Sequence, residues 1–158
     1  MSSLWNLDRS AALQLQPSAF AVTHEMHPRW NDNDSYGHVN NAVYYEYFDT
    51  AINNWMLEGL PDSESRESIM MFVVESACRY LGELQYPSPM LIAHRVAEIG
   101  RSSVTHELGI FADIESDSPR LAALGRWVHV CVDSGTKKPV SIPDDFRELL
   151  SSAIVAPA

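Results

Sequence analysis

The order of hydrophobic periodicities is the feature that most constrains how this chain can fold. Between residues 42 and 60 apolar side chains recur every three to four residues, the spacing of an amphipathic helix. The residues on this apolar face are Tyr44, Phe48, Ala51, Ile52 and Trp55. After a polar loop, the pattern from residue 69 to residue 133 alternates in steps of two, as in β-strands. The single long helix can therefore bury its apolar face only if the sheet curls around it.

Four long strand segments follow the predicted helix, and one precedes it. The four later segments are 69–84, 91–99, 104–114 and 121–133, and the earlier one is 20–30. In the first of the four, the even-numbered residues Met70, Phe72, Val74, Ser76, Cys78 and Tyr80 are predicted to share one face. A short helix is expected after Pro143. The pattern predicts an α+β fold in which a curved antiparallel sheet wraps around one long central helix.

The chain is predicted to form one globular domain. Its 158 residues are 46% hydrophobic, enough for a sizeable core. Residues 1–18 are expected to form an irregular N-terminal lead-in, residues 19–150 the single domain and residues 151–158 a C-terminal tail. No apolar run is long enough to span a bilayer, and residues 1–17 do not resemble a secretory signal.

The net charge indicates which partners are disfavoured, and the cysteines indicate the cellular compartment. The formal net charge of −10 disfavours nucleic acid and anionic membrane as partners, because both reward a basic surface. The two cysteines, Cys78 and Cys131, lie among apolar residues of predicted strands. We interpret them as buried, reduced thiols of a cytoplasmic protein.

A polar run directly before the helix holds most of the chemistry-bearing residues. Residues 29–41 read Arg-Trp-Asn-Asp-Asn-Asp-Ser-Tyr-Gly-His-Val-Asn-Asn, with two acids, a glycine and a histidine. Asn40 or Asn41 is predicted to cap the helix. A carboxylate just before a helix N-terminus combines a base or nucleophile with backbone N–H donors, and acyl transfer needs both.

The pattern Trp-x-Asp-x-Asp-x-x-Gly-His-x-Asn-Asn-x-x-Tyr over residues 30–44 resembles hotdog-fold acyl-CoA thioesterases, within them the 4-hydroxybenzoyl-CoA thioesterase family. The resemblance covers residues 21–147. It implies that Asp34, the second aspartate of the pair, is the catalytic carboxylate. It also implies that the amide of Asn41 or a neighbour polarises the thioester carbonyl, and that His38 matches a histidine of several relatives. It further implies a homodimer, or a dimer of dimers, with the active site at the subunit interface.

The residues support hydrolysis of an acyl-CoA thioester without a cofactor or metal. Asp34 can act as general base on water or as a nucleophile, and the sequence does not choose between these roles. Helix N-terminal amides can stabilise the oxyanion, each donor contributing roughly 3–4 kcal/mol in other enzymes. Asp32 is interpreted as a residue that shapes the turn. His38 either orients the carboxylate or contacts the thioester, or it is a structural hydrogen-bonding residue beside Gly37.

Further residues are candidates for binding the substrate. Tyr44, Tyr45 and Phe48 are predicted walls of the acyl pocket, suited to a long chain or an aryl group. Arg101, in the predicted turn between two strands, is the first candidate for the CoA phosphates. Glu75 is unusual in an otherwise apolar strand, where it either pairs with Arg79 or lines the cleft near the dimer interface.

Two other functions fit the same fold. One is a hotdog enoyl hydratase or dehydratase, although that chemistry places a histidine and an acid at the acyl chain instead of an acid in a turn before the helix. The other is a non-catalytic protein that binds acyl thioesters. The histidines outside the polar run show no metal-ligand spacing, so no metal site is predicted.

Overall fold

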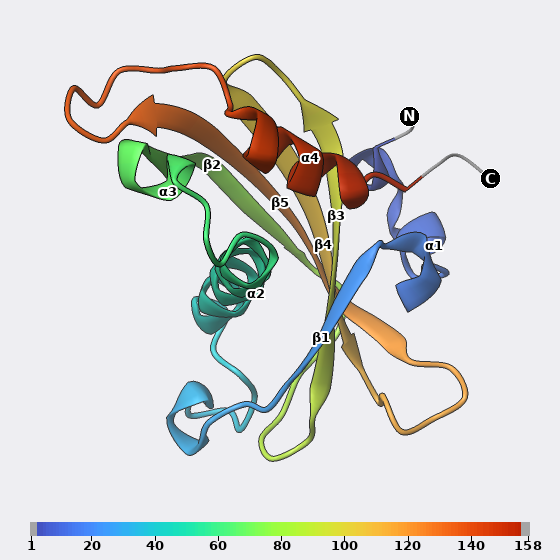
Figure 1. Cartoon of the computed structure of the whole chain (residues 1–158). Coiled ribbons are helices and arrows are strands. Elements are labelled where there is room, and N and C mark those ends of the chain that lie inside the picture. Colours follow the sequence, from blue (N-terminus) through green and yellow to red (C-terminus); the bar gives the residue numbers. More distant parts are fainter. Residues whose placement is uncertain (1–2, 156–158) are drawn as a thin grey trace.

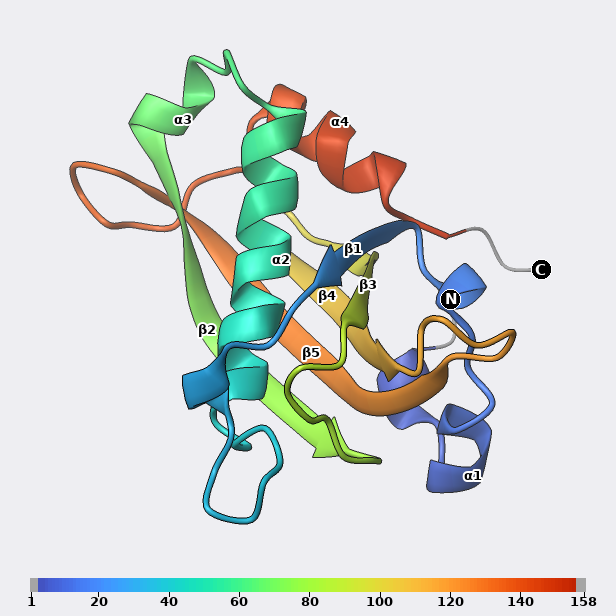
Figure 2. The same cartoon turned by 90° about the horizontal axis from the view of Figure 1, so that it is seen from below.

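The computed structural model describes residues 3–155, in which a five-stranded antiparallel sheet curves around one long helix (Figures 1 and 2). The strands follow the order β1-β3-β4-β5-β2 across the sheet. Their bounds are β1 Val22–Met26, β2 Ile69–Tyr80, β3 Met90–Ile99, β4 Ser103–Ala112 and β5 Arg120–Asp133. The helices after β1 are α2 Val43–Gly59, α3 Ser65–Ser68 and α4 Asp144–Ser152, with a 3-10 turn, η3 Trp30–Asp32, before them. This is the hotdog fold, so the predicted fold class is confirmed.

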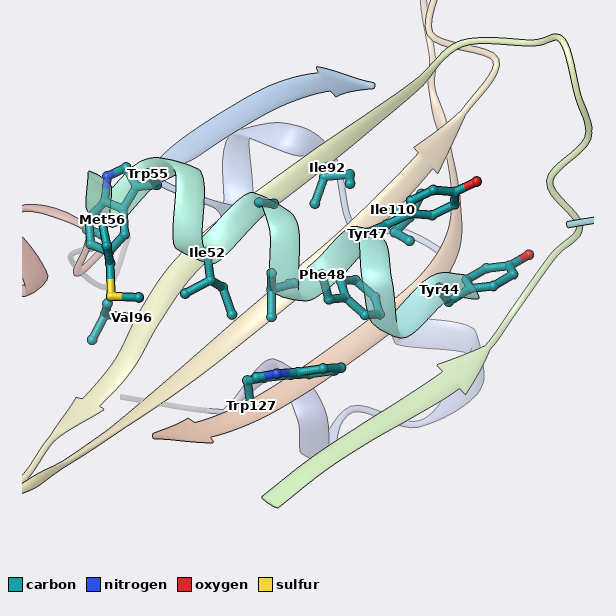
Figure 3. Close-up of a cluster of buried hydrophobic side chains, with 14 of the residues drawn as sticks. Tyr44, Tyr47, Phe48, Ile52, Trp55, Met56, Ile92, Val96, Ile110 and Trp127 are labelled. Carbon is teal, nitrogen blue, oxygen red and sulfur yellow. The ribbon is translucent and has the colours of Figure 1, made fainter. Parts of the chain in front are cut away.

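Helix α2 packs its apolar face on the inner face of the sheet, as Figure 3 shows. All five residues predicted for this face are buried. The ring of Phe48 lies over Gly125 of β5, where an added Cβ would come within 2.8 Å of the ring atoms. The glycine therefore lets the helix approach the sheet closely. Tyr47 and Met56 are also buried, which widens the face beyond the predicted stripe.

Strand β2 contains a β-bulge that the sequence pattern did not reveal. Its pairing with β5 shifts register around Val74. Met71 before the bulge and Cys78 after it both pack against the core beneath α2, although they are an odd number of residues apart. Phe72 therefore lies on the opposite face from Tyr80. The prediction that the even-numbered residues of this strand share one face was wrong, because the bulge reverses the alternation.

The N-terminal lead-in packs on the outer face of the sheet, away from α2. It consists of three short helical segments, η1 Leu4–Asn6, α1 Arg9–Ala12 and η2 Pro17–Ala19. Leu4 and Ala12 join Phe20 in a second apolar cluster against outward side chains of the sheet. The rings of Phe20 and Phe111 meet edge to face at 5.9 Å. The outer face of the sheet is thus partly covered by the chain itself.

Two charged side chains of the sheet fasten this lead-in by hydrogen bonds. Arg79 donates to the carbonyls of Trp5 (2.9 Å) and Leu7 (2.7 Å), and its guanidinium lies over the Trp5 ring at 5.8 Å. The buried Glu107 is paired with Arg95 at 2.6 Å and accepts a hydrogen bond from the Trp5 amide at 3.1 Å. The lead-in therefore supplies hydrogen-bond partners to Arg79 and Glu107, two charged residues of the outer face.

Three histidines form a row across the inner face of the sheet. His94 on β3, His106 on β4 and His129 on β5 are all buried, and Nε2 of His94 lies 2.8 Å from Nδ1 of His106. The ring centres of His106 and His129 are 5.2 Å apart. Burial lowers the pKa of His94 to about 3 and lowers the pKa of the other two as well, against an opposing effect of Asp49 at His129. All three imidazoles are therefore neutral near pH 7.

Within residues 3–155, no group of three or more His, Cys, Asp or Glu side chains is arranged to hold a metal ion. No helix in this part of the chain is long and apolar enough to cross a membrane.

The histidine row predicts that stability falls steeply as the pH drops below about 6.5, the ordinary histidine pKa that unfolding restores. Between there and pH 5 the unfolded chain binds up to three protons that the folded chain does not. The free energy of unfolding should then decrease by up to about 4 kcal/mol per pH unit. Urea unfolding followed by circular dichroism from pH 8 to pH 5 measures this slope. A free energy of unfolding that stays constant from pH 7 to pH 5 would contradict the assignment.

Candidate functional site

The candidate site is built on the loop of residues 29–41, which joins β1 to α2 and projects beside the start of that helix (Figure 2). The loop doubles back on itself, with the Asp34 amide donating to the His38 carbonyl at 2.8 Å. Gly37 adopts a φ of +83°, a conformation that favours glycine, at the tip of this turn. The local fold therefore brings the backbone of His38 next to Asp34 in one turn.

Asp32 fastens the loop to the helix. Its side chain is only 2% exposed and accepts hydrogen bonds from the amide and Nε of Arg29, at 2.7 and 2.9 Å, and from the Tyr47 hydroxyl of α2 at 2.6 Å. Burial alone would raise the pKa of Asp32, but the bonds from Tyr47 and Arg29 outweigh it and hold that pKa below its usual value. Asp32 is thus a buried, ionised anchor, which agrees with its predicted role in shaping the turn.

Asp34 is half-buried and uses one carboxylate oxygen to stabilise its own turn. Oδ1 accepts from the amides of Tyr36 at 2.8 Å and His38 at 3.4 Å. In the part of the chain that the structure describes, no hydrogen bond reaches the second oxygen, Oδ2. The turn therefore fixes the carboxylate and leaves one oxygen available to a water or a substrate.

The first turn of α2 is irregular and leaves a backbone donor unused. Ala42 occupies the N-cap position, and the Asn40 side chain accepts from the Ala42 amide at 2.9 Å. The predicted asparagine cap is therefore displaced: Asn40 acts from two residues before the helical cap position. Among residues 3–155, the Asn41 amide has no hydrogen-bond acceptor. This N–H lies at the positive end of the helix dipole, where an oxyanion is stabilised.

His38 lies at the edge of a small cleft beside the loop. Its Nε2 is 3.2 Å from the carboxylate of Glu83, and the cleft has a volume of about 190 Å³. Arg120 also lines this cleft, where it pairs with Asp113 at 3.2 Å and donates to the Glu83 carbonyl at 3.2 Å. His38 is thus close to Asp34 through the backbone of the turn, while its side chain is directed to Glu83.

All three aromatic residues predicted to wall the acyl pocket belong to α2, and Figure 3 shows Tyr44 and Phe48 between this helix and the sheet. Tyr44 and Phe48 are buried in the core, where the ring of Phe48 packs against Trp127 at 5.5 Å. Tyr45 is half-buried and lies 5.3 Å from the same tryptophan. In this protomer their contacts are those of core residues.

Glu75 and Arg101 are not brought to the loop within one protomer. Glu75 forms an ion pair with Arg126, so the alternative of a pair with Arg79 is wrong. The bulge in β2 turns Glu75 toward the outer face of the sheet. The Arg101 carbonyl accepts from Arg147 of α4 at 3.3 Å, and α4 packs at the C-terminal end of α2, the opposite end from Asp34.

The structure adds residues that sequence reasoning did not assign to the site. Trp30 is 76% exposed and lines a hollow of about 440 Å³ between the loop and the first turn of α2. Tyr80 donates from its hydroxyl to the Asn41 carbonyl at 2.8 Å. The sequence could have indicated Trp30, because this residue belongs to the motif of residues 30–44. The sequence could not have indicated Tyr80, because its contact with Asn41 depends on the pairing of β2 and on the bulge.

The fold and the loop together define a thioesterase-like hotdog protein. The family model of the Thioesterase-like superfamily matches residues 28–150, and the chain belongs to this superfamily.

The chain is also similar to individual proteins along most of its length. The chain is 34% identical to the PA5185 protein of Pseudomonas aeruginosa strain PAO1, with a TM-score of 0.82 and coverage of 90% of this chain and 97% of that one. It is 27% identical over 134 residues to the YsmA protein of Bacillus subtilis (strain 168), covering 84% and 87% of the two chains. Slr0204, a 1,4-dihydroxy-2-naphthoyl-CoA thioesterase from Synechocystis, has the same fold at 16% identity and a TM-score of 0.71, over 82% and 94% of the chains.

The Tyr47→Phe substitution tests the anchor of the loop. It removes the hydroxyl that donates to the buried Asp32 carboxylate and keeps the ring in the core. The free energy of unfolding should fall by about 1.5–3 kcal/mol, the usual contribution of a hydrogen bond to a charged group. Urea unfolding at pH 7 measures the loss. Tyr86→Phe is the matched control and should change stability far less, since the Tyr86 hydroxyl has no hydrogen bond within residues 3–155.

Proposed function

We propose that this protein hydrolyses acyl-CoA thioesters to a free acid and CoA. The proposal rests on two groups at the N-terminal end of α2. One Asp34 carboxylate oxygen and the Asn41 amide both have no hydrogen-bond partner in the described chain. A thioester carbonyl between them would meet a base or nucleophile and an oxyanion donor.

The reaction can be written with Asp34 in either of two roles. As general base, Asp34 takes a proton from water, the water oxygen attacks the thioester carbon, and the oxyanion accepts a hydrogen bond from the Asn41 amide. The C–S bond then breaks, and the CoA thiolate leaves. As nucleophile, Asp34 forms a mixed anhydride with release of the thiolate, and water then hydrolyses the anhydride.

CoA is proposed as the carrier because the resemblance of the motif and the function of a similar fold both support it. Slr0204, which shares the fold, is a 1,4-dihydroxy-2-naphthoyl-CoA thioesterase. The free thiols of Cys78 and Cys131 fit a reducing compartment, so we place the reaction in the cytoplasm.

We propose that the working unit is a homodimer that pairs through the β2 edge. Strand β2 is the last strand of the sheet and exposes Phe72, Val73 and Val74, the last at 61%. An exposed, apolar edge strand offers unpaired backbone groups to a second strand. Tyr80 at the end of β2 contacts Asn41, so this edge adjoins the site. A second copy would supply surface that one protomer lacks around Asp34.

Thiol release from a panel of acyl-CoA thioesters tests the activity. The wild-type protein should release CoA from at least one alkyl or aryl thioester, while Asp34→Asn and Asp34→Ala should lower kcat roughly 10²- to 10⁴-fold with folding retained. Asp117→Asn is the matched control, an exposed acid in the β4–β5 loop, and should keep wild-type activity.

Two outcomes of this assay would contradict the proposal. Equal activity in the Asp34 variants would remove Asp34 as the reacting group. Absence of release from every thioester would favour a non-catalytic binder, and hydration of an enoyl-CoA without release would favour the hydratase.

Light scattering tests the dimer. The wild-type protein should have twice the mass of one chain or a multiple of it. The Val73→Lys/Val74→Lys double variant should be monomeric and lose activity, because charges on an edge strand oppose pairing. Ile154→Lys, an exposed apolar residue away from β2, should remain a dimer. A monomeric wild-type protein with full activity would contradict the shared site.

A further inference from the structure

The carbonyl of Asn41 is directed out of the helical hydrogen-bond ladder. In a regular α-helix the amide of Tyr45 would donate to the Asn41 carbonyl, four residues earlier. Here the Tyr45 amide donates to the Ala42 carbonyl at 3.2 Å, and the Val43 amide donates to Asn40 at 2.9 Å. Both are the shorter three-residue contacts of a tightened turn. The Asn41 carbonyl is left to accept from the Tyr80 hydroxyl at 2.8 Å.

Contacts with α2 and with the N-terminal lead-in position Tyr80. Its ring packs edge to face against Tyr44 of α2 at 5.1 Å. Its own carbonyl and that of Leu81 accept from the guanidinium of Arg9, at 3.4 and 2.9 Å, so the lead-in fixes the end of β2. Burial raises the pKa of Tyr80 to about 12, so the hydroxyl stays protonated and remains a donor at neutral pH. Tyr80 is 42% exposed, so its hydroxyl bond to the Asn41 carbonyl lies at the surface of the protomer.

We propose that Tyr80 is a positioning residue for the oxyanion donor: its bond to the Asn41 carbonyl holds the Asn41 backbone outside the helical hydrogen-bond ladder, with the Asn41 N–H directed to the thioester oxygen. The Asn40 side chain completes this arrangement by occupying the next amide, that of Ala42. The proposal rests on the proposed thioesterase function and deepens it. It adds a residue from the far strand of the sheet to a site otherwise built on the loop of residues 29–41.

The position of Tyr80 also links catalysis to assembly. Tyr80 is the last residue of β2, the strand proposed to pair with a second copy. Pairing would therefore place the partner copy beside the residue whose hydroxyl binds the Asn41 carbonyl. The site of each protomer would then depend on the partner through Tyr80 as well as through any shared surface.

The Tyr80→Phe variant tests the proposal, because it removes the hydroxyl and keeps the ring that packs on Tyr44. With a thioester cleaved by the wild-type protein, kcat should fall about tenfold while KM stays within about twofold. This loss is smaller than the 10²- to 10³-fold loss of a whole oxyanion donor, since the amide is misplaced and not removed. Tyr86→Phe, which also loses one tyrosine hydroxyl, should keep both constants.

A second readout does not depend on activity. In ¹H–¹⁵N spectra of the dimer, Tyr80→Phe should shift the amides of Asn41 and Ala42, and Tyr86→Phe should not. An unchanged kcat, or a rise in KM alone, would overturn the positioning role, as would an unchanged Asn41 amide. Absence of thioester cleavage by the wild-type protein would instead defeat the proposed function, and the spectra would still test whether Tyr80 orders the Asn41 segment.

Discussion

The buried carboxylate of Asp32 is the interaction on which the geometry of the site depends. It joins Arg29 at the start of the loop to Tyr47 on the second turn of α2, so the loop cannot move independently of the helix. A charged group buried to this extent is stable only while all its partners stay in place. The network therefore fixes the angle at which the turn carrying Asp34 leaves the helix. Asp34, the proposed reactive aspartate, is not part of this network, and within residues 3–155 its Oδ2 accepts no hydrogen bond.

The two neighbouring aspartates of the loop have different environments, and these suit different roles. Asp32 is buried, fully bonded and held ionised by its partners, which suits an anchor. Asp34 is half-buried and bonded on one oxygen only, which suits a group that must meet a substrate. The Asn41 amide, at the N-terminus of α2, is the proposed hydrogen-bond donor to the thioester oxygen.

Much of the fold was predictable because it depends on local periodicity. The face of α2 and the polar turn before this helix follow from spacing and from residue type, and the structure confirms both. The faces of β2 were not predictable, because a bulge at Val74 is set by pairing with β5. The same limit explains Tyr80, whose partner Asn41 is far away in sequence. It also explains Phe48, where an aromatic residue on an apolar helical face is equally suited to a pocket and to the core.

We propose that the thioester carbonyl binds between Asp34 and the Asn41 amide. A crystal structure of the Asp34→Asn variant with a bound acyl-CoA tests it most directly. The carbonyl oxygen should lie within about 2.7–3.1 Å of the Asn41 nitrogen, with the side chain at position 34 facing the carbonyl carbon. A thioester bound with its carbonyl away from the N-terminus of α2 would contradict it.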